Sequence, residues 1–301
     1  MDPNVELGAF LRSRRARVRP QDAGVVPTGT ARRVPGLRRE EVAYLAGVSV
    51  DYYARMEQGR QQNVSDAVLD AVARALNLDE VEHRHLLDLA RRQTAPAGRR
   101  GPERPQRVRP EVYQMLDLLG ESAPAVVMGH RMDVLATNRL ARILITDFDA
   151  LPHRERNMAV FQFLDPAARD LYADWEAVAT DSVAMLRLYA GRHPDDPLLT
   201  DLIGRLSIRS PEFRTWWATH QVREKTHGAK RYRHPLVGEI TVGYEVFTFA
   251  GDPDQTLCVY TPEPGASTDA LRLLASWTAP PAAPAAVRTP PDEAHPRPDA
   301  S

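Results

Sequence analysis

Short apolar stripes at helical spacing fill the first ninety residues and are separated by polar breaks. Leu7, Phe10 and Leu11 follow the i, i+3, i+4 spacing of an amphipathic helix. Glycine and proline interrupt residues 20–36, which predicts a loop there. The same spacing and helix-end signals predict five helices, over residues 5–17, 39–46, 50–58, 65–76 and 79–89. This pattern predicts a compact all-helical bundle.

The signals around residue 47 describe a tight turn between two of these helices. Gly47 can adopt positive φ and so can end the second helix. Ser49 is a favoured N-cap for the third helix, which leaves Gly47, Val48 and Ser49 as the whole turn. Ala43 and Ala46 are small enough for the two helices to cross closely. A short turn between two steeply crossing helices predicts a helix-turn-helix unit.

The third predicted helix has one apolar side and one polar side. Val48, Tyr53 and Met56 can fill the space between the crossing helices. The residues left on the outer face are Val50, Asp51, Tyr52 and Arg55. Nine helical residues extend about 13 Å at about 1.5 Å each. The major groove of B-DNA is about 12 Å wide, so this helix has the dimensions of a DNA-reading helix.

Beyond residue 110 the helical pattern is mixed with strict alternation. Residues 124–130 and 132–138 are two short β-rich runs that predict a hairpin. Ile240, Val242 and Tyr244 alternate with polar neighbours, and a second strand is predicted over 256–261 after a turn at 251–254. Helices are predicted over residues 111–119, from 138, in one long run opened by Asp165 and Pro166, over 198–206, from 210, and over 269–277. The mixture predicts an antiparallel sheet covered by helices, an α+β domain.

Composition and charge divide the chain into four parts. Residues 1–110 hold 20 arginines and 14 acidic residues, a net charge of +6, whereas residues 111–301 have a net charge of −7. Residues 94–110 and 279–301 are rich in proline and lack apolar periodicity. We therefore expect a helix-turn-helix domain at 1–92, a basic linker at 93–110, a second domain at 111–278 and a disordered tail at 279–301. The basic first half indicates a polyanionic partner.

Several classes of protein are excluded by composition. The chain has no apolar run of 18 residues, and its first ten residues lack the basic and apolar segments of a secretory signal. We expect no membrane contact and a cytoplasmic location. Cys258 is the sole cysteine, so an internal disulfide cannot form. HExxH, GxSxG and a glycine-rich phosphate loop are absent, so no catalytic residue, cofactor or metal site is predicted.

The motifs LRSRR, LRREEVAYLAGVS and DYYARMEQGR resemble the XRE family with its lambda-repressor-like helix-turn-helix, in the form found in MmyB-like regulators. The resemblance implies that Val50, Asp51 and Arg55 face base edges, and that Arg15 and Glu57 lock together inside the fold. Arg55 could bond a guanine and Val50 could contact a thymine methyl, whereas Asp51 repels phosphate but could accept from a cytosine amine. The full predicted DNA interface is Arg38, Arg39, Ser49, Val50, Asp51, Tyr52, Arg55 and Arg60.

The second half resembles the MmyB-like ligand-binding domain, whose fold is PAS-like, through VLATN, SPEFRTWWATHQV, KRYRHPLVGEITVGYE and TLCVYTPEPGAS. The resemblance implies a pocket between sheet and helices for a small amphipathic or fatty-acid-like effector. Aromatic stripes more often belong to a core than to a pocket, and a buried arginine can simply pair with a carboxylate. The residues predicted to line the pocket are Asn138, Trp175, Arg187, Tyr189, Phe213, Trp216, Trp217, His220 and Tyr244.

These patterns together predict a transcription regulator that binds duplex DNA as a homodimer and responds to a small molecule. Two alternatives stay open at this point. A ligand-independent regulator would bind its operator whether or not a small molecule is present. A protein-docking scaffold would have the same helical bundle but no specific DNA binding.

Overall fold

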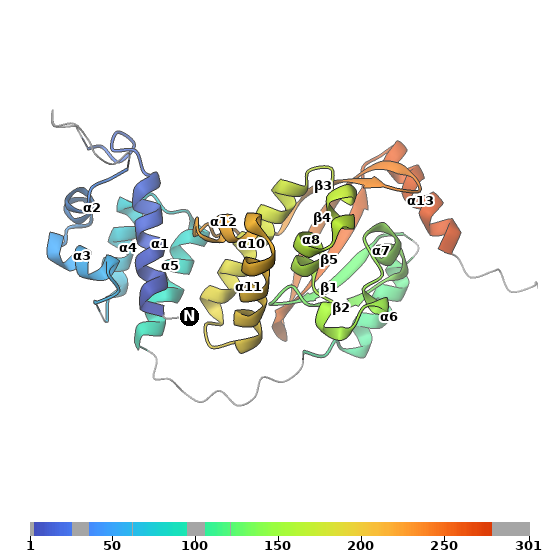
Figure 1. Ribbon diagram of the computed structural model, residues 1–301, viewed down its shortest axis with the longest axis horizontal. Helices are drawn as coiled ribbons and strands as arrows, with labels where there is room; N and C mark the ends of the chain where they lie inside the picture. Colours follow the sequence, from blue (N-terminus) through green and yellow to red (C-terminus); the bar gives the residue numbers. More distant parts are fainter. Residues whose placement is uncertain (1–2, 26–35, 62, 95–105, 121, 279–301) are drawn as a thin grey trace, which may run out of the picture.

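The computed structural model describes residues 3–25, 36–61, 63–94, 106–120 and 122–278 (Figure 1). A helical bundle forms the N-terminal part, and a mixed helix and sheet domain forms the C-terminal part. The predicted tail and residues 95–105 of the predicted linker lie outside the described residues. No described helix combines the length and apolar composition that crossing a bilayer requires.

The N-terminal bundle contains the five predicted helices. They are α1 (Pro3–Arg17), α2 (Arg39–Ala46), α3 (Val50–Glu57), α4 (Asp66–Ala75) and α5 (Glu80–Thr94). Their apolar stripes meet in one core, in which Leu7, Phe10, Tyr53 and Met56 are fully buried. The core forms because each stripe follows the helical period and so lies on one side of its helix.

The predicted turn between α2 and α3 is confirmed in detail. Gly47 has φ +66° and its N–H donates to the carbonyls of Ala43 and Tyr44, which ends α2. The Oγ atom of Ser49 accepts a 3.1 Å hydrogen bond from the backbone N–H of Tyr52 and so caps α3. The two helices are therefore separated by three residues, as a helix-turn-helix requires.

Five antiparallel strands form the sheet of the C-terminal domain, in the order β2-β1-β5-β4-β3. They are β1 (Ala125–Gly129), β2 (Val134–Thr137), β3 (His227–His234), β4 (Gly238–Phe249) and β5 (Asp252–Pro262). The predicted α+β, PAS-like class is confirmed by this sheet and its helices. The predicted hairpin corresponds to β1 and β2, which pair antiparallel.

Helices cover both faces of the sheet. The helices of this domain are α6 (Pro110–Leu119), α7 (Arg139–Leu144), α8 (Met158–Leu164), α9 (Pro166–Leu171), α10 (Trp175–Arg192), α11 (Pro197–Arg209), α12 (Pro211–Trp217) and α13 (Ala266–Thr278). Helices α11 and α12 pack against α8 and α10. Two short 3₁₀ turns, η1 (Phe148–Ala150) and η2 (His153–Glu155), lie between α7 and α8. Along β1, Val126 joins the large core with α8 and α10, whereas Val127 packs with α6. Successive side chains of a strand point to opposite faces, so β1 contributes to both layers.

The long helix predicted after Asp165 is wrong, because the structure has two helices there. Asp165 caps the short α9 through the backbone N–H of Ala167, and a separate α10 begins at Trp175. Between them the chain pairs with the edge strand β3. Tyr172 forms an antiparallel β-bridge with Tyr232, and the backbone N–H of Ala173 donates to the carbonyl of Arg231. Hydrogen bonds to a strand distant in sequence interrupt the helix, which local periodicity cannot anticipate.

Three further differences separate the predicted elements from the observed ones. The edge strand β3 was not predicted because its alternation is weak: His227, Gly228 and Ala229 are exposed, and Tyr232 is fully buried. The predicted turn at 251–254 is shorter in the structure, because β5 already begins at Asp252. Helix α8 was also missed, because all but its last residue are buried and no polar face reveals its period.

Candidate DNA interface and ligand cavity

Helix α3 presents a polar outer face at the far end of the bundle from the C-terminal domain (Figure 1). Val50, Asp51 and Arg55 are exposed on this face, and Ser49 and Arg60 are exposed at its two ends. Val50 is apolar, yet half of its surface is exposed on this face. Exposed contact residues on a capped helix of this length suit insertion into a major groove.

A buried ion-pair cluster fixes α3 against α1 and α2. Arg15 donates two hydrogen bonds of 2.8 and 2.9 Å to the fully buried carboxylate of Glu57, and Arg39 donates two more. Burial alone would raise the pKa of Glu57, but the bonds from both arginines outweigh burial and hold that pKa below its ordinary value. The predicted Arg15–Glu57 lock is confirmed.

The predicted DNA-contacting residues differ in how free their side chains are. Arg39 is engaged with Glu57, although 44% of its side chain is exposed. Arg38 is partly buried, and its NH1 atom lies 3.4 Å from the Oε1 atom of Glu40. Tyr52 is partly buried against the core. The fold thus brings all eight predicted residues to the α2–α3 side of the bundle.

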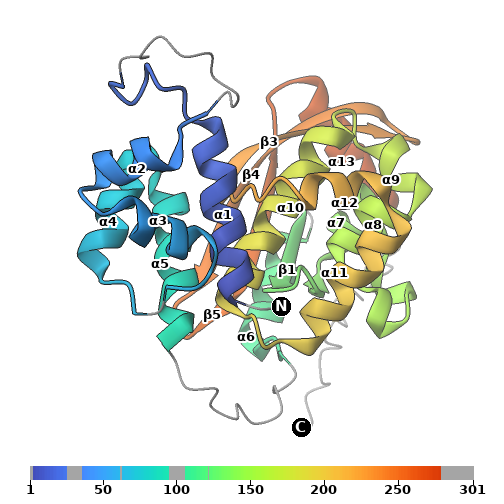
Figure 2. The same ribbon diagram turned by 60° about the vertical axis from the view of Figure 1, so that its left-hand side comes forward.

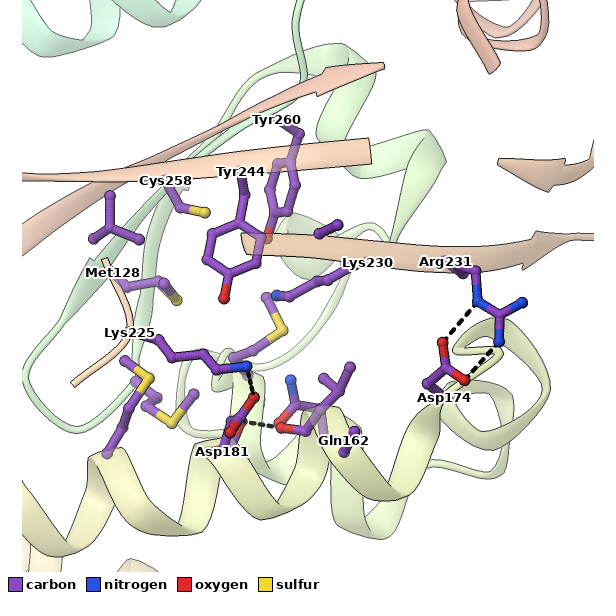
Figure 3. Close-up of a pocket in the computed structure, with 18 residues that line it drawn as sticks. Met128, Gln162, Asp174, Asp181, Lys225, Lys230, Arg231, Tyr244, Cys258 and Tyr260 are labelled. Carbon is purple, nitrogen blue, oxygen red and sulfur yellow. Dashed lines mark hydrogen bonds and ion pairs between the residues drawn. The ribbon is translucent and has the colours of Figure 1, made fainter. Parts of the chain in front are cut away.

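A cavity of about 210 Å³ lies between the sheet and the helices α8 and α10 (Figure 3). Four methionines and the single cysteine supply much of its apolar wall, so five of the eight sulfur atoms of the chain line one cavity. Methionine side chains are flexible and polarizable, and they adapt to ligands of irregular shape. The sulfur-bearing residues are Met128, Met132, Met158, Met185 and Cys258.

Lys230 brings a positive charge into this cavity. Its Nζ atom lies 4.9 Å from the ring centre of Tyr244 and 5.4 Å from that of Tyr260. Among the described residues it forms no ion pair, and burial lowers the pKa of its ammonium group. The Oε1 atom of Gln162, also at the cavity, is buried, and no described residue donates a hydrogen bond to it. A cation and an unsatisfied acceptor in an apolar cavity can orient a ligand with a polar end.

A second polar group lies where α10 meets the cavity. Asp181 forms ion pairs with Lys225 and with Arg223, whose NH1 atom is 2.9 Å away. Asp174, which precedes α10, forms a separate bidentate pair with Arg231 of β3 (Figure 3). Lys225 is therefore paired with a carboxylate, whereas Lys230 has no such pair within the described part of the chain.

Of the nine residues predicted to line the pocket, Tyr244 alone lines this cavity. The aromatic residues pack together instead: Phe213 stacks on Trp217 with ring centres 5.6 Å apart, and Trp175 lies 5.7 Å from Trp216. Tyr189, which is partly buried, packs against the core of the C-terminal domain. Their helical spacing marks a core face of the helices. Core faces and pocket walls share that spacing, so the spacing alone does not distinguish them.

The three polar residues in that prediction have other structural partners. The side chain of Asn138 accepts from the N–H groups of Ala125 and Ala141 and donates to the carbonyl of Ala123, which ties α7 to β1. Arg187 is 2% exposed and bonds Glu6 of α1 at 2.9 Å, together with His220. These side chains hold elements together and do not line the cavity.

Most cavity residues could not be found from the sequence. Lys225 and Lys230 are the only lysines among 39 basic residues, and both line the cavity. That rarity is the one sequence signal that could have indicated them. The methionines come from β1, its turn, α8 and α10, which are joined only by the folded sheet. Within the described residues no group of three His, Cys, Asp or Glu side chains is placed to hold a metal ion.

Comparison with known families agrees with both halves of the structure. Residues 108–274, more than half of the chain, match the family model for the MmyB-like transcription regulator ligand binding domain. Residues 6–86 match the model for a helix-turn-helix domain. No curated protein matches the chain.

Proposed function

The chain belongs to the family of transcription regulators with a MmyB-like ligand-binding domain, and we propose that it binds a specific DNA operator through α3. We further propose that an amphipathic or fatty-acid-like effector raises or lowers its affinity for that operator. The exposed, capped face of α3 carries the DNA proposal. The cavity beneath α10 carries the effector proposal. The predicted limits of the domains (1–92 and 111–278), the homodimer and the cytoplasmic location are part of the same proposal.

Arg55 is the residue proposed to read a base. It is exposed in the last turn of α3, and a guanidinium can bond O6 and N7 of guanine together. Val50 supports the same face with an apolar contact suited to a thymine methyl group. Asp51 is proposed to accept from a cytosine amine, and Ser49, Tyr52 and Arg60 to meet phosphates.

Selection from random duplexes tests DNA binding and identifies the operator in one experiment. Full-length protein is used to select duplexes from a random pool at near-physiological salt, and affinity for the recovered sequence is compared with affinity for its scrambled version. We expect convergence on one sequence, and Arg55→Ala should cost about 1–3 kcal/mol and relax one base position. Arg74→Ala, an exposed arginine of α4, is the matched control. Equal affinity for selected and scrambled duplexes would show a scaffold instead of a regulator.

The cavity supports an effector with an apolar body and a polar, anionic end. Methionine, valine and tyrosine side chains surround the apolar space. The ammonium group of Lys230 lies beside it, and no carboxylate of the described residues forms an ion pair with it. An anion bound there would compensate for the water that this half-buried ammonium group has lost. An effector of this kind changes DNA affinity only if it binds two arrangements of the protein unequally.

Native mass spectrometry of the purified full-length chain, compared with its denatured mass, tests effector and stoichiometry together. We expect a dimer that carries extra mass of small-molecule size. Val246→Trp, which fills the cavity from β4, should lose that mass and keep the dimer. A bare mass for the wild type, unchanged by added long-chain carboxylic acids, would favour a ligand-independent regulator.

A further inference from the structure

One segment of the chain contacts both the DNA-binding bundle and the ligand cavity. We call residues 218–226, which join α12 to β3, the connecting segment. Val222 is 7% exposed and packs into the core of the N-terminal bundle. Lys225, three residues later, lines the cavity of the other domain. A movement of this short segment would therefore change contacts both in the core of the bundle and at the cavity.

The bundle holds the connecting segment through α1 and α5. The Oγ of Ser13 donates a 2.9 Å hydrogen bond to the carbonyl of Thr219, and Arg14 donates to the carbonyl of His220. On α5, Arg84 donates a 2.8 Å hydrogen bond to the carboxylate of Glu224. These contacts lie on the side of the bundle away from α3, so they leave the proposed DNA-reading face open (Figure 2).

The cavity holds the same segment through one carboxylate. Asp181 pairs with Arg223 and with Lys225, which lie on either side of Glu224. Glu224 pairs with Arg84 of the bundle at 2.8 Å and also lies 3.7 Å from the guanidinium of Arg192 in α10. Its two neighbours pair with Asp181 at the cavity wall. A negatively charged ligand in the cavity would compete with the Asp181 carboxylate for these two cations.

Helix α10 joins the two sites by a second route. Asp181 and Met185 line the cavity, and Arg187, six residues after Asp181 and about 9 Å along the helix, pairs with Glu6 of α1. Near the end of α10, a Cβ atom added at Gly191 would collide with the ring of His85 in α5, so the helix and the bundle are in close contact.

From this arrangement we infer that the connecting segment couples the cavity to the docking of the DNA-binding bundle. An anionic ligand beside Lys225 and Lys230 competes with Asp181 for Lys225, frees the connecting segment, and so weakens its hold on α1 and α5. The inference rests on the proposed effector only for the source of the anion. By thermodynamic linkage the coupling is reciprocal, so loosening the interface strengthens ligand binding.

Hydrogen exchange of the ligand-free full-length chain tests the coupling without any effector. Asp181→Asn removes the charge that holds Arg223 and Lys225, and Asp174→Asn is the matched control at the opposite end of the cavity. We expect Asp181→Asn to speed exchange about threefold or more in residues 218–226 and in α1 and α5, as loss of part-exposed ion pairs implies. Asp174→Asn should leave these residues at the wild-type rate. Wild-type exchange in Asp181→Asn, or equal changes in both variants, would overturn the inference.

A binding experiment tests the reciprocal effect with a defined probe. The anionic amphipathic dye 8-anilinonaphthalene-1-sulfonate is titrated against wild type, Arg84→Gln and the control Arg74→Gln, with Val246→Trp to show that the signal comes from the cavity. Arg84→Gln removes a bundle contact without touching the cavity, and we expect it to bind the dye about threefold more tightly. Arg74→Gln should bind as wild type does.

The outcomes separate the two proposals. Dye binding that Val246→Trp abolishes, with equal affinity in wild type and Arg84→Gln, would contradict the coupling and leave the effector proposal standing. Absence of dye binding together with faster exchange in Asp181→Asn would contradict the proposed anionic effector and support the coupling.

Discussion

Glu57 shows at the scale of one residue how the DNA-reading helix is held in place. Its carboxylate is fully buried and bonded by Arg15 and Arg39, so removing it leaves two cations beside an apolar core. Loss of one partner from a buried ion pair typically costs several kcal/mol, because the remaining charge is desolvated.

We therefore expect Glu57→Ala to lower the free energy of unfolding of the bundle by about 3–5 kcal/mol. Urea unfolding of the full-length chain, followed by circular dichroism, measures the effect. Glu40→Ala is the matched control, because this acidic residue is exposed on α2. Similar urea midpoints for both variants would show that the cluster does not stabilise the bundle.

His220 gives the interface between the domains a dependence on pH. Burial, with repulsion from Arg187 and Arg12, lowers the pKa of His220 to about 4. This holds although the Oε2 atom of the Glu6 carboxylate lies 3.7 Å from the Nδ1 atom of His220. The unfolded chain takes up a proton near pH 6.5, whereas the folded chain does so only near pH 4. The contribution of His220 to stability is therefore complete above pH 6.5 and is lost as the pH falls toward 4.

At pH 4.5 this loss should amount to about 2–3 kcal/mol relative to pH 7. Other carboxylates titrate in this range, so the measurement is the difference between wild type and His220→Asn in urea midpoint at both pH values. Asparagine tolerates the φ of +52° found at this position. We expect the variant to lose less stability on acidification, and an identical loss in both proteins would contradict the assignment.

At the scale of elements, the α2–α3 turn depends on backbone conformation more than on packing. A Cβ atom at Gly47 would meet no atom of the described residues within 4 Å, so the penalty for Gly47→Ala comes from its φ of +66°. We expect a loss of about 1 kcal/mol in stability, measured by thermal unfolding.

Gly204→Ala is the matched control for this prediction. Gly204 lies within α11, and there too a Cβ atom would meet nothing. Because alanine favours a helix over glycine, this change should stabilise the chain by about 0.5–1 kcal/mol. Stabilisation by both changes would show that the left-handed turn does not constrain the helix-turn-helix.

The break between α9 and α10 shows what element-scale patterns omit. Leu171, Trp175 and Val178 fit one helical stripe, yet the chain leaves the helix at Tyr172 to pair with β3. The backbone groups of Tyr172 and Ala173 gain sheet-type hydrogen bonds there. A long-range hydrogen bond competes with the local pattern, and the local pattern does not contain it.

For the whole molecule, the separation of charge predicts how DNA binding depends on salt. The first 110 residues have a net charge of +6, and the proposed phosphate contacts include Arg60. Each phosphate contact adds about −0.9 to the slope of log affinity against log salt concentration. Arg60→Gln should therefore reduce the magnitude of that slope by about one for each bound copy, measured on the selected duplex between 50 and 200 mM salt. Over this range the affinity of the wild type should fall about 10³-fold or more. An unchanged slope would place Arg60 away from the backbone.

The sequence by itself determined the local structure of the bundle and the class of both halves. Helix periodicity, the Gly47 and Ser49 signals and the alternation in β4 are local, because propensity and capping act within a few residues. The family-specific motifs determined the regulator class in the same way. Tertiary structure alone decided the cavity, the connecting segment and the interface between the domains. Asp181, Glu224 and Lys230 gain their roles from neighbours supplied by α5, α10 and the sheet, and only the folded chain brings those elements together.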